Sequence, residues 1–188
     1  MADITLTAAA PLGAQSVRIG PNRIEERTDL AVVSVAGPLG AEAALAAALN
    51  AAWNIDMPTP CVSSVSGDIR AVQTTADQIF LIFRHRNPDA GGLVSEKIGD
   101  AGYTTDQTDA WVILDLSGPD TRAALERVCP VDLAPQTFPE NAAARTVMEH
   151  LGALIVRTDE DQFLLMSARS SAGSFLHTVE TSFRNVAG

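Results

Sequence analysis

Three histidines are the first side chains in this sequence that could do chemistry, because imidazole binds metals and exchanges protons near neutral pH. His85, His150 and His177 lie in three different segments. No two of them have the one-turn helical spacing that places both rings on one metal ion. The sequence therefore predicts no metal site.

Serine and cysteine offer no stronger candidate for a nucleophile. Ser64, Ser66 and Ser170 lack the glycine-flanked turn that exposes a hydrolase serine. Cys61 and Cys129 are far apart and form no C-x-x-C pair, so neither a disulfide framework nor a zinc site is predicted. We expect two buried or half-buried thiols and no catalytic residue in this chain.

Two short motifs each allow a ligand-binding and a structural interpretation. Gly37-Pro38-Leu39-Gly40 could hold a phosphate, but it lacks the third glycine of a dinucleotide motif, and Pro38 removes an N–H. A structural turn is the better interpretation. Asp159-Glu160-Asp161 could hold a cation, yet adjacent acids between strands are more often a solvated turn. The sequence predicts no cofactor site at either motif.

Arginines follow the last predicted strand of each half of the chain. Arg84-His85-Arg86 lies before one predicted helix, and Arg169 lies before another. Such arginines can hold a carboxylate or a partner's acidic side chain in a bidentate pair. They can equally donate to helix or loop carbonyls, and the sequence leaves the two roles open.

The elements that must position these residues occur twice in the sequence. A Thr-Asp pair, a Val-rich or Leu-rich strand and a Gly-Pro turn begin at Thr28 and again at Thr108. An Asp-Gln pair opens an apolar strand at Asp77 and again at Asp161. This indicates two copies of one folding unit inside one domain, since a stacked solenoid would need three or more repeats.

The pattern of apolar residues and turns predicts an α+β fold of two β2-α-β3-α halves with antiparallel sheets, in which helices cover one side of each sheet. Leu39, Leu45 and Leu49 are expected to form the apolar stripe of the first helix, and Ser117 or Gly118 to cap the third. The expected strands are 17–19, 23–26, 30–36, 62–65, 69–74, 79–83, 103–105, 110–116, 143–148, 153–157 and 162–166, and the expected helices begin at Pro38 and cover 91–98, 119–128 and 170–183.

We expect a flexible N-terminal arm over residues 1–16 and one pseudo-twofold domain over 17–188, with halves of about 17–100 and 101–188. A chain of 188 residues that is 46% hydrophobic can bury a core without disulfides. Its net charge of −10 argues against nucleic acid and anionic membranes as partners. The sequence shows neither a signal peptide nor a membrane-spanning stretch, so a cytoplasmic location is expected.

The second half of the sequence carries a series of motifs that resembles a known family. Their combined order is similar to that of the gamma subunit of heterotetrameric sarcosine oxidase, most closely from residue 111 to 179 and more weakly from 12 to 102. The motifs are Ser117–Leu125, Cys129–Leu133, Phe138-Pro139, Ala144–Thr146, Phe163–Met166 and Arg169-Ser170.

This resemblance implies a fold like the folate-binding domain of the glycine-cleavage aminomethyltransferase, in which two strand–helix–strand units exchange their first strands. It also implies an accessory role in a complex that oxidatively demethylates sarcosine to glycine. The alpha, beta and delta subunits would be the partners, and FAD, FMN, NAD and tetrahydrofolate would lie on those subunits and not on this chain. The segments 8–16 and 130–139 are expected to meet the partners, because both contain proline and exceed a simple turn.

One departure from the folate enzymes bears on mechanism. By the resemblance, those enzymes carry paired carboxylates on the strand before the motif at 77–83, whereas this chain reads Ile69-Arg70-Ala71-Val72, with Asp68 in a turn. We therefore expect no productive folate binding. The alternatives are a stand-alone tetrahydrofolate-binding domain of the aminomethyltransferase type, or the gamma subunit of an N-methylglutamate dehydrogenase complex.

Overall fold

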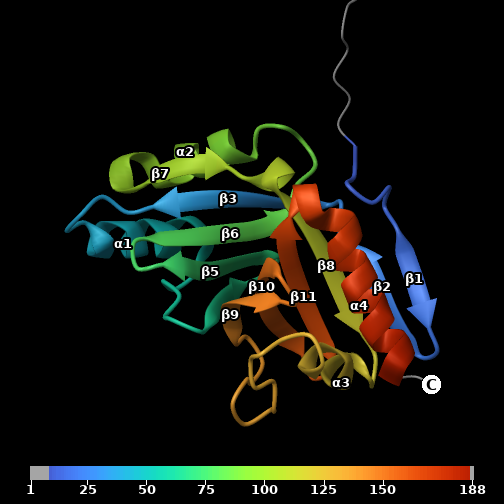
Figure 1. Ribbon diagram of the computed structural model, residues 1–188. Coiled ribbons are helices and arrows are strands. Elements are labelled where there is room, and N and C mark those ends of the chain that lie inside the picture. Colours follow the sequence, from blue (N-terminus) through green and yellow to red (C-terminus); the bar gives the residue numbers. More distant parts are fainter. Residues whose placement is uncertain (1–8, 187–188) are drawn as a thin grey trace, which may run out of the picture.

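The computed structural model describes residues 9–186, which form two antiparallel sheets flanked by helices (Figure 1). The strands are β1 (Ser16–Ile19), β2 (Asn22–Glu26), β3 (Leu30–Ala36), β4 (Ser63–Ser66), β5 (Ile69–Thr75), β6 (Gln78–Arg84), β7 (Tyr103–Asp106), β8 (Trp111–Ser117), β9 (Ala143–Met148), β10 (Leu151–Asp159) and β11 (Gln162–Ala168). The α-helices are α1 (Glu42–Trp53), α2 (Ala90–Ile98), α3 (Thr121–Glu126) and α4 (Ala172–Val186), and short 3-10 turns are η1 (Gly99–Ala101), η2 (Thr108–Ala110) and η3 (Arg169–Ser171).

The two sheets exchange strands between the halves of the chain. One sheet has the order β1-β2-β8-β11-β10-β9, and the other has the order β4-β5-β6-β3-β7. Strand β2 therefore pairs with β8 of the second half, while β7 pairs with β3 of the first half. If the second order is read from β7, the sheets run β2-β8-β11-β10-β9 and β7-β3-β6-β5-β4, which are equivalent orders, and β1 is an additional strand. The antiparallel α+β fold and the strand exchange implied by the resemblance are confirmed.

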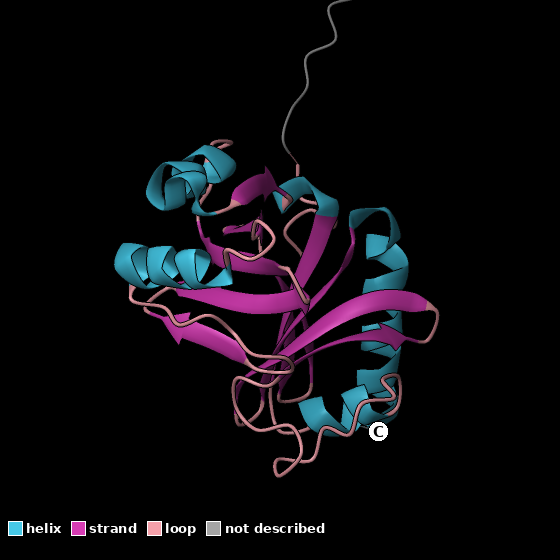
Figure 2. Ribbon diagram, turned by 90° about the vertical axis from the view of Figure 1, so that its left-hand side faces the viewer, coloured by secondary structure: helices cyan, strands magenta, loops and turns pink. Residues whose placement is uncertain are grey.

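The molecule has four layers (Figure 2). An apolar layer between the sheets contains Val32, Ile82, Ile113 and Met166, among others. Helices α1 and α2 cover the outer face of the five-stranded sheet, and α3 and α4 cover the outer face of the six-stranded sheet. Each sheet is thus buried on both faces, which explains why strands such as β3 are continuous apolar runs and not alternating ones.

The edges of the two sheets meet at one place. Val62 and Ala142, which lie just before β4 and β9, form an isolated antiparallel bridge. The N–H of Ser63 donates to the carbonyl of Asn141, and the N–H of Ala143 donates to the carbonyl of Cys61. These bonds satisfy backbone groups at two edges that would otherwise be open to pairing with another chain.

The predicted start of the first helix is wrong. Helix α1 begins at Glu42 and not at Pro38, and Leu39 is fully exposed and not part of the apolar stripe. The reason is local: Gly40 has a φ of 79°, a left-handed conformation that a right-handed helix cannot contain. Leu45 and Leu49 are buried against the sheet, as predicted.

The predicted start and cap of the third helix are also wrong. Helix α3 covers only Thr121–Glu126, and Asp120, which makes no side-chain capping bond, is the residue that precedes it. Gly118 has a φ of 125°, and a Cβ there would come within 2.5 Å of the Asn22 side chain. The exchanged strand β2 therefore occupies the space next to this turn, which requires glycine at position 118.

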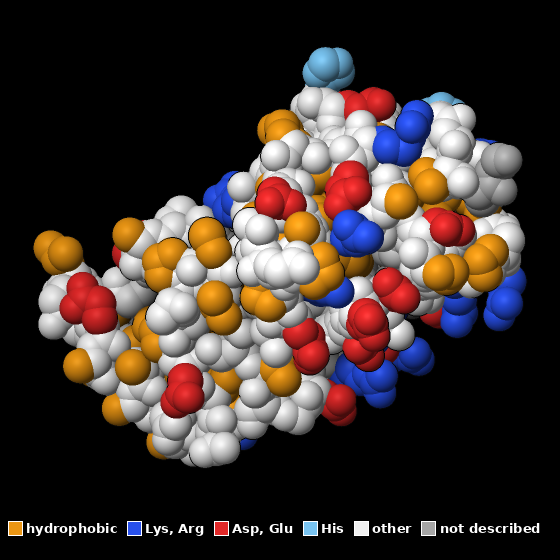
Figure 3. Space-filling view, turned by 90° about the horizontal axis from the view of Figure 1, so that it is seen from below, with side chains coloured by type: hydrophobic (Ala, Val, Ile, Leu, Met, Phe, Trp, Pro, Cys, Tyr) orange, Lys and Arg blue, Asp and Glu red, His pale blue; other side chains and the backbone are white. Residues whose placement is uncertain are grey.

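Charged side chains are unevenly distributed over the surface. On the face seen from below, Lys and Arg gather mainly in the right half, and the left half shows mostly hydrophobic and uncharged side chains with a few acids (Figure 3). Helix α1, on that left side, has Glu42 as its single charged residue. No helix within residues 9–186 is long and apolar enough to cross a membrane.

Candidate functional site

The structure does not bring the three histidines together. His85 lies after β6 and is 2.6 Å from the carboxylate of Asp89, His150 lies in the turn between β9 and β10, and His177 lies on α4. Over residues 9–186, no three His, Cys, Asp or Glu side chains gather in a way that could hold a metal ion.

The two cysteines have different environments. Cys129 is buried next to the core of the six-stranded sheet, as expected. The expectation for Cys61 is wrong, because this residue is exposed in a tight turn with a φ of 65°. The turn places its carbonyl toward Ala143, so the backbone of Cys61 serves the bridge between the two sheets while its thiol faces solvent.

The two segments expected to meet partners are both fixed to this chain's own body. Residues 1–8 of the predicted arm lie outside the described residues, but the buried Glu26 carboxylate accepts hydrogen bonds from the N–H groups of Leu12 and Ala14 at 2.9 and 2.6 Å. In the second segment, Leu133 and Phe138 are buried in the core.

Arg157 holds the second segment in place. It is 5% exposed and donates to the carbonyls of Phe138, Asp159 and Glu160 at 3.0, 3.2 and 2.6 Å. Two of these carbonyls belong to the acidic motif between β10 and β11, so that motif is a turn whose backbone is bound by an arginine.

The arginines after the last strands of each half do not form a common clamp. Arg84 ends β6, is mostly exposed and lies 3.6 Å from Asp29. Arg169 lies in η3, donates to the carbonyl of Ala9 and is 3.5 Å from Asp109. Both therefore contact other parts of this chain, and Arg84 also borders the second of the two pockets described below.

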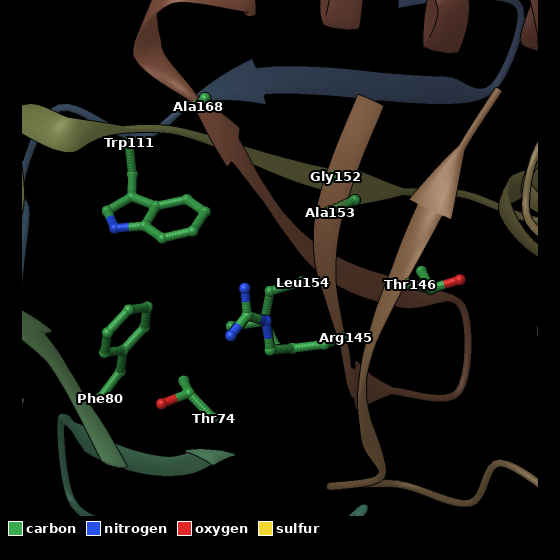
Figure 4. Close-up of a pocket in the computed structure, with 9 residues that line it drawn as sticks. All are labelled: Thr74, Phe80, Trp111, Arg145, Thr146, Gly152, Ala153, Leu154 and Ala168. Carbon is green, nitrogen blue, oxygen red and sulfur yellow. The ribbon is translucent and has the colours of Figure 1, made fainter. Parts of the chain in front are cut away.

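A first pocket opens between the sheets next to Arg145 of β9, and we refer to it as the Arg145 pocket. It has a volume of about 210 Å³ and contains no acidic side chain in its lining. Phe80 and Trp111 form an edge-to-face pair with ring centroids 5.4 Å apart. In Figure 4 the Arg145 side chain extends from its strand toward these rings, past Leu154. The full lining is Thr74, Phe80, Trp111, Arg145, Thr146, Gly152, Ala153, Leu154 and Ala168.

The Trp111 indole nitrogen is buried and has no hydrogen-bond acceptor among residues 9–186. It lies on the edge of the ring that faces away from Arg145 (Figure 4). The Arg145 guanidinium and the indole N–H therefore do not converge on one point.

A second pocket of about 250 Å³ contains Arg70 of β5, and we refer to it as the Arg70 pocket. Its charges are largely paired with one another. Arg27 forms ion pairs with Asp29 at 2.7 Å and Asp115 at 3.1 Å. Arg70 donates to Asn141 Oδ1 at 2.9 Å and to Ser63 Oγ. The full lining is Arg27, Leu30, Val65, Gly67, Asp68, Ile69, Arg70, Ile82, Arg84, Asp115, Thr158, Gln162 and Leu164.

Burial and pairing shift the pKa values in the Arg70 pocket in opposite directions. Hydrogen bonds from Arg27 lower the pKa of Asp29, and the same bonds raise the pKa of Arg27. Desolvation raises the pKa of Asp115 above its ordinary value even though Arg27 is close, and desolvation lowers the pKa of Arg70. Arg27 therefore pairs with two carboxylates whose pKa values are shifted in opposite directions, downward for Asp29 and upward for Asp115.

The two pockets occupy equivalent positions in the duplicated fold. In the strand registers, Leu30 pairs with Arg84 as Trp111 pairs with Ala168, and Val65 pairs with Arg70 as Arg145 pairs with Leu154. These registers make the following residues equivalent, with the Arg145 pocket first: Thr74 and Thr158, Phe80 and Leu164, Trp111 and Leu30, Arg145 and Val65, Gly152 and Asp68, Ala153 and Ile69, Leu154 and Arg70, and Ala168 and Arg84.

Sequence reasoning found neither pocket. The Arg145 pocket takes its lining from six strands, some in each half of the chain, so no short motif describes it. A signal was nevertheless present, since alignment of the two copies places Arg145 opposite Val65 and Arg70 opposite Leu154. Each of these two cross-strand pairs has its arginine at the position where the other copy has an aliphatic residue, and this difference marks the two pockets.

Solved structures define the fold. The chain superposes on a chain of the heterotetrameric sarcosine oxidase from Corynebacterium sp. U-96 with a TM-score of 0.79 and 21% identity, covering 92% of this chain and 89% of that one. It superposes on the glycine cleavage system aminomethyltransferase T from Bartonella henselae with a TM-score of 0.59 and 15% identity, covering 82% of this chain and 44% of that one. The fold is therefore of the class shared by these two proteins.

Sequence relatives define the family. Sarcosine oxidase subunit gamma from Arthrobacter sp. is 30% identical over 161 residues, which cover 86% of this chain and 78% of the relative. The subunit of the same name from Corynebacterium sp. (strain U-96) is 27% identical over 175 residues, which cover 92% of this chain and 82% of the relative. No family model matches the chain. The chain belongs to the family of sarcosine oxidase gamma subunits, as the resemblance implied.

Proposed function

We propose that this chain is the accessory gamma subunit of a cytoplasmic heterotetrameric sarcosine oxidase, which supports assembly with the alpha, beta and delta subunits. The complex would oxidatively demethylate sarcosine to glycine, with FAD, FMN, NAD and tetrahydrofolate held by the partners. The observation that carries this proposal is the 30% identity to a sarcosine oxidase gamma subunit over 86% of the chain.

The chemistry of the two pockets supports a role without catalysis. The Arg145 pocket has no carboxylate in its lining that could transfer a proton. In the Arg70 pocket, Arg70 lies on the strand where the resemblance places the acids of folate enzymes, and its guanidinium is bound to Ser63 and Asn141. Asp115 is held by Arg27. The lining acid that has no ion pair within residues 9–186, Asp68, lies in the exposed turn before β5 and not on the strand itself.

The layered structure supports a scaffold made of one pseudo-twofold domain over residues 17–188. Each sheet takes a strand from the other half, and both sheets contribute to the apolar layer between them. Neither half could keep its sheet intact if the other were removed. A rigid unit of this kind is suited to being held by larger subunits.

Co-expression tests the proposal. A tagged copy of this chain is expressed with the products of its neighbouring genes and purified through the tag. We expect a yellow assembly with flavin absorbance that oxidises sarcosine. The tag alone, expressed with the same gene products, is the control. Recovery of this chain alone, free of flavoprotein, would contradict the proposal.

Two further measurements separate the alternatives. If the purified assembly oxidises N-methylglutamate and not sarcosine, the complex is an N-methylglutamate dehydrogenase. Calorimetric titration of the isolated chain with tetrahydrofolate should give no binding heat. Saturable heat would support a stand-alone folate-binding domain instead.

A further inference from the structure

Arg145 is a cation without a counter-ion in a chain of net charge −10. It takes part in none of the ion pairs or side-chain hydrogen bonds found between residues 9 and 186, and no acidic residue lines its pocket. Arg145 is exposed on its edge strand, but it also lines a mostly apolar pocket. An anionic group bound in this pocket could accept a bidentate pair from its guanidinium.

The equivalent pocket shows the same backbone plan with arginines that have partners within the chain. There Arg70 bonds to Ser63 and Asn141, and Arg27 is paired with Asp29 and Asp115. An acid, Asp68, occupies the position that Gly152 holds in the Arg145 pocket. The Arg145 pocket therefore has the position of its counterpart in the fold but no acidic side chain in its lining.

The walls of the Arg145 pocket restrict the body of the anion. Phe80, Trp111 and Leu154 present apolar surface beside the guanidinium (Figure 4). Ala153, Ala168 and Gly152 leave room because their side chains are small or absent. The volume of about 210 Å³ lies below that of typical pockets for drug-sized ligands. A single ring fits these conditions better than a dinucleotide or a peptide.

We propose that the Arg145 pocket binds a small organic carboxylate with a flat apolar body. The carboxylate pairs with the Arg145 guanidinium, and the body lies against Phe80, Trp111 and Leu154. The proposed binding involves no covalent chemistry.

The test uses the full chain, benzoate as the probe and the indole N–H signals of Trp53 and Trp111 in NMR spectra as the readout. Trp53 is an internal control, because it lies on α1 on the far side of the five-stranded sheet. Benzoate should shift the Trp111 signal in a saturable way, with a dissociation constant of about a millimolar for one ion pair and one ring. Benzamide, which has the same shape without the charge, should bind at least about tenfold more weakly.

Matched variants identify the residue responsible. Arg145→Gln should weaken benzoate binding about tenfold, and Arg145→Lys, which keeps the charge, should retain most of it. Arg86→Gln is the control: Arg86 is exposed and, like Arg145, has no ion pair among residues 9–186. It should leave binding within about twofold, since it removes a positive charge outside the pocket.

A second pair of variants transfers one residue of the equivalent pocket. A side chain at Gly152 would meet open space, because no atom other than those of Gly152 and its two chain neighbours lies within 4 Å of the position of its Cβ. Gly152→Asp should abolish benzoate binding by supplying Arg145 with an internal anion, and Gly152→Asn, of the same size, should largely retain it.

Three results would overturn the proposal: no saturable shift of Trp111, equal binding of benzoate and benzamide, or equal losses for Arg145→Gln and Arg86→Gln. Each is distinct from a failed co-purification, since the titration needs no partner subunit.

Discussion

The two pockets between the sheets have one backbone plan and opposite treatments of charge. Each contains a cross-strand pair of one arginine and one aliphatic residue, Val65 with Arg70 in one and Leu154 with Arg145 in the other. The arginine lies on β5, inside its sheet, in the first pair, and on the edge strand β9 in the second. An inner strand removes water from the guanidinium and so requires protein partners, whereas an edge strand leaves the guanidinium free.

The same contrast recurs elsewhere between equivalent positions. Arg157 of β10 is equivalent to Gln73 of β5, because each lies just before the register shift of its hairpin. Glu26 of β2 is equivalent to Asp106 of β7 through their pairing with β8 and β3. Arg157 and Glu26 are buried, with several backbone partners, whereas Gln73 Oε1 has no partner among residues 9–186 and Asp106 is exposed. Buried charge organises loops around the six-stranded sheet but not around the other.

The largest effect is expected at Arg157. Arg157→Ala should lower the free energy of unfolding by about 3 kcal/mol, because three carbonyls lose a charged donor and the loop over Phe138 loses its anchor. Gln73→Ala should cost less than about 1 kcal/mol, since Gln73 donates one long bond to Ala76. Urea unfolding of both variants measures the difference. Equal costs would mean that the two hairpins do not differ in this way.

The next effect concerns the two first strands. Glu26→Gln should cost about 2 kcal/mol, because the carboxylate accepts N–H bonds from Leu12, Ala14 and Gln15 and an amide can replace only part of this. It should also raise amide hydrogen exchange in that segment. Asp106→Asn is the matched control and should change stability by less than about 0.5 kcal/mol, because Asp106 accepts one exposed bond. Unchanged exchange after Glu26→Gln would contradict this role.

A smaller effect with a defined pH dependence is expected at the ion pairs of Arg27, which lines the Arg70 pocket. Asp29→Asn should cost about 1.5 kcal/mol at neutral pH through loss of the Arg27 pair. Arg27 lowers the pKa of Asp29 below 3.8, so folding favours the ionised form, and this stability is lost as the pH falls through the folded-state pKa. The difference between wild type and variant should therefore shrink below pH 3.8.

Asp115 should behave in the opposite sense. Burial raises its pKa above 3.8, so folding favours the protonated form, and this contribution is present below 3.8 and lost as the pH rises through the folded-state pKa. Relative to Asp115→Asn, the wild type should gain stability as the pH falls. Unfolding curves across pH 3 to 7 test both variants. If stability changed with pH in the same direction for both variants relative to the wild type, the opposite pKa shifts of Asp29 and Asp115 would be contradicted.

The smallest effect compares the two Gly-Pro turns. Asp120 follows Gly118-Pro119 and accepts a bond from Asn22 at 2.9 Å, whereas Leu39 follows Gly37-Pro38 and is fully exposed. Asp120→Leu should lower the melting temperature through a loss of about 1 kcal/mol. The reverse change, Leu39→Asp, should cost less than about 0.5 kcal/mol. A larger cost at Leu39 would show that its turn is more constrained than its exposure indicates.

Much of the fold could be predicted from the sequence because its signals are local. The apolar runs at Leu30–Ala36 and Gln162–Ala168 are strands, as expected, and the duplicated order of elements is present in both sheets. The start of α1 was missed because Pro38 is a favourable first residue of a helix, while the left-handed Gly40 two residues later excludes one.

The pockets and the buried charges could not be predicted in the same way. Glu26 looks like a surface acid in a short hairpin, and its burial follows from the return of the N-terminal segment over β2. Arg145 and Val147 alternate along an edge strand like ordinary exposed residues. What distinguishes Arg145 is the arrival of Phe80 from the other sheet, more than sixty positions away in the chain.

The sequence by itself determined the repeated order of strands and helices, the residues available for the core and the family, since each is written in local periodicity or in motif order. The family resemblance implied the exchange of β2 and β7, but only the tertiary structure decided that Arg70 has partners within the chain while Arg145 has no ion pair among residues 9–186. The physical reason is that strand pairing and desolvation depend on which distant segments come together, and the local sequence of a strand does not specify its neighbour.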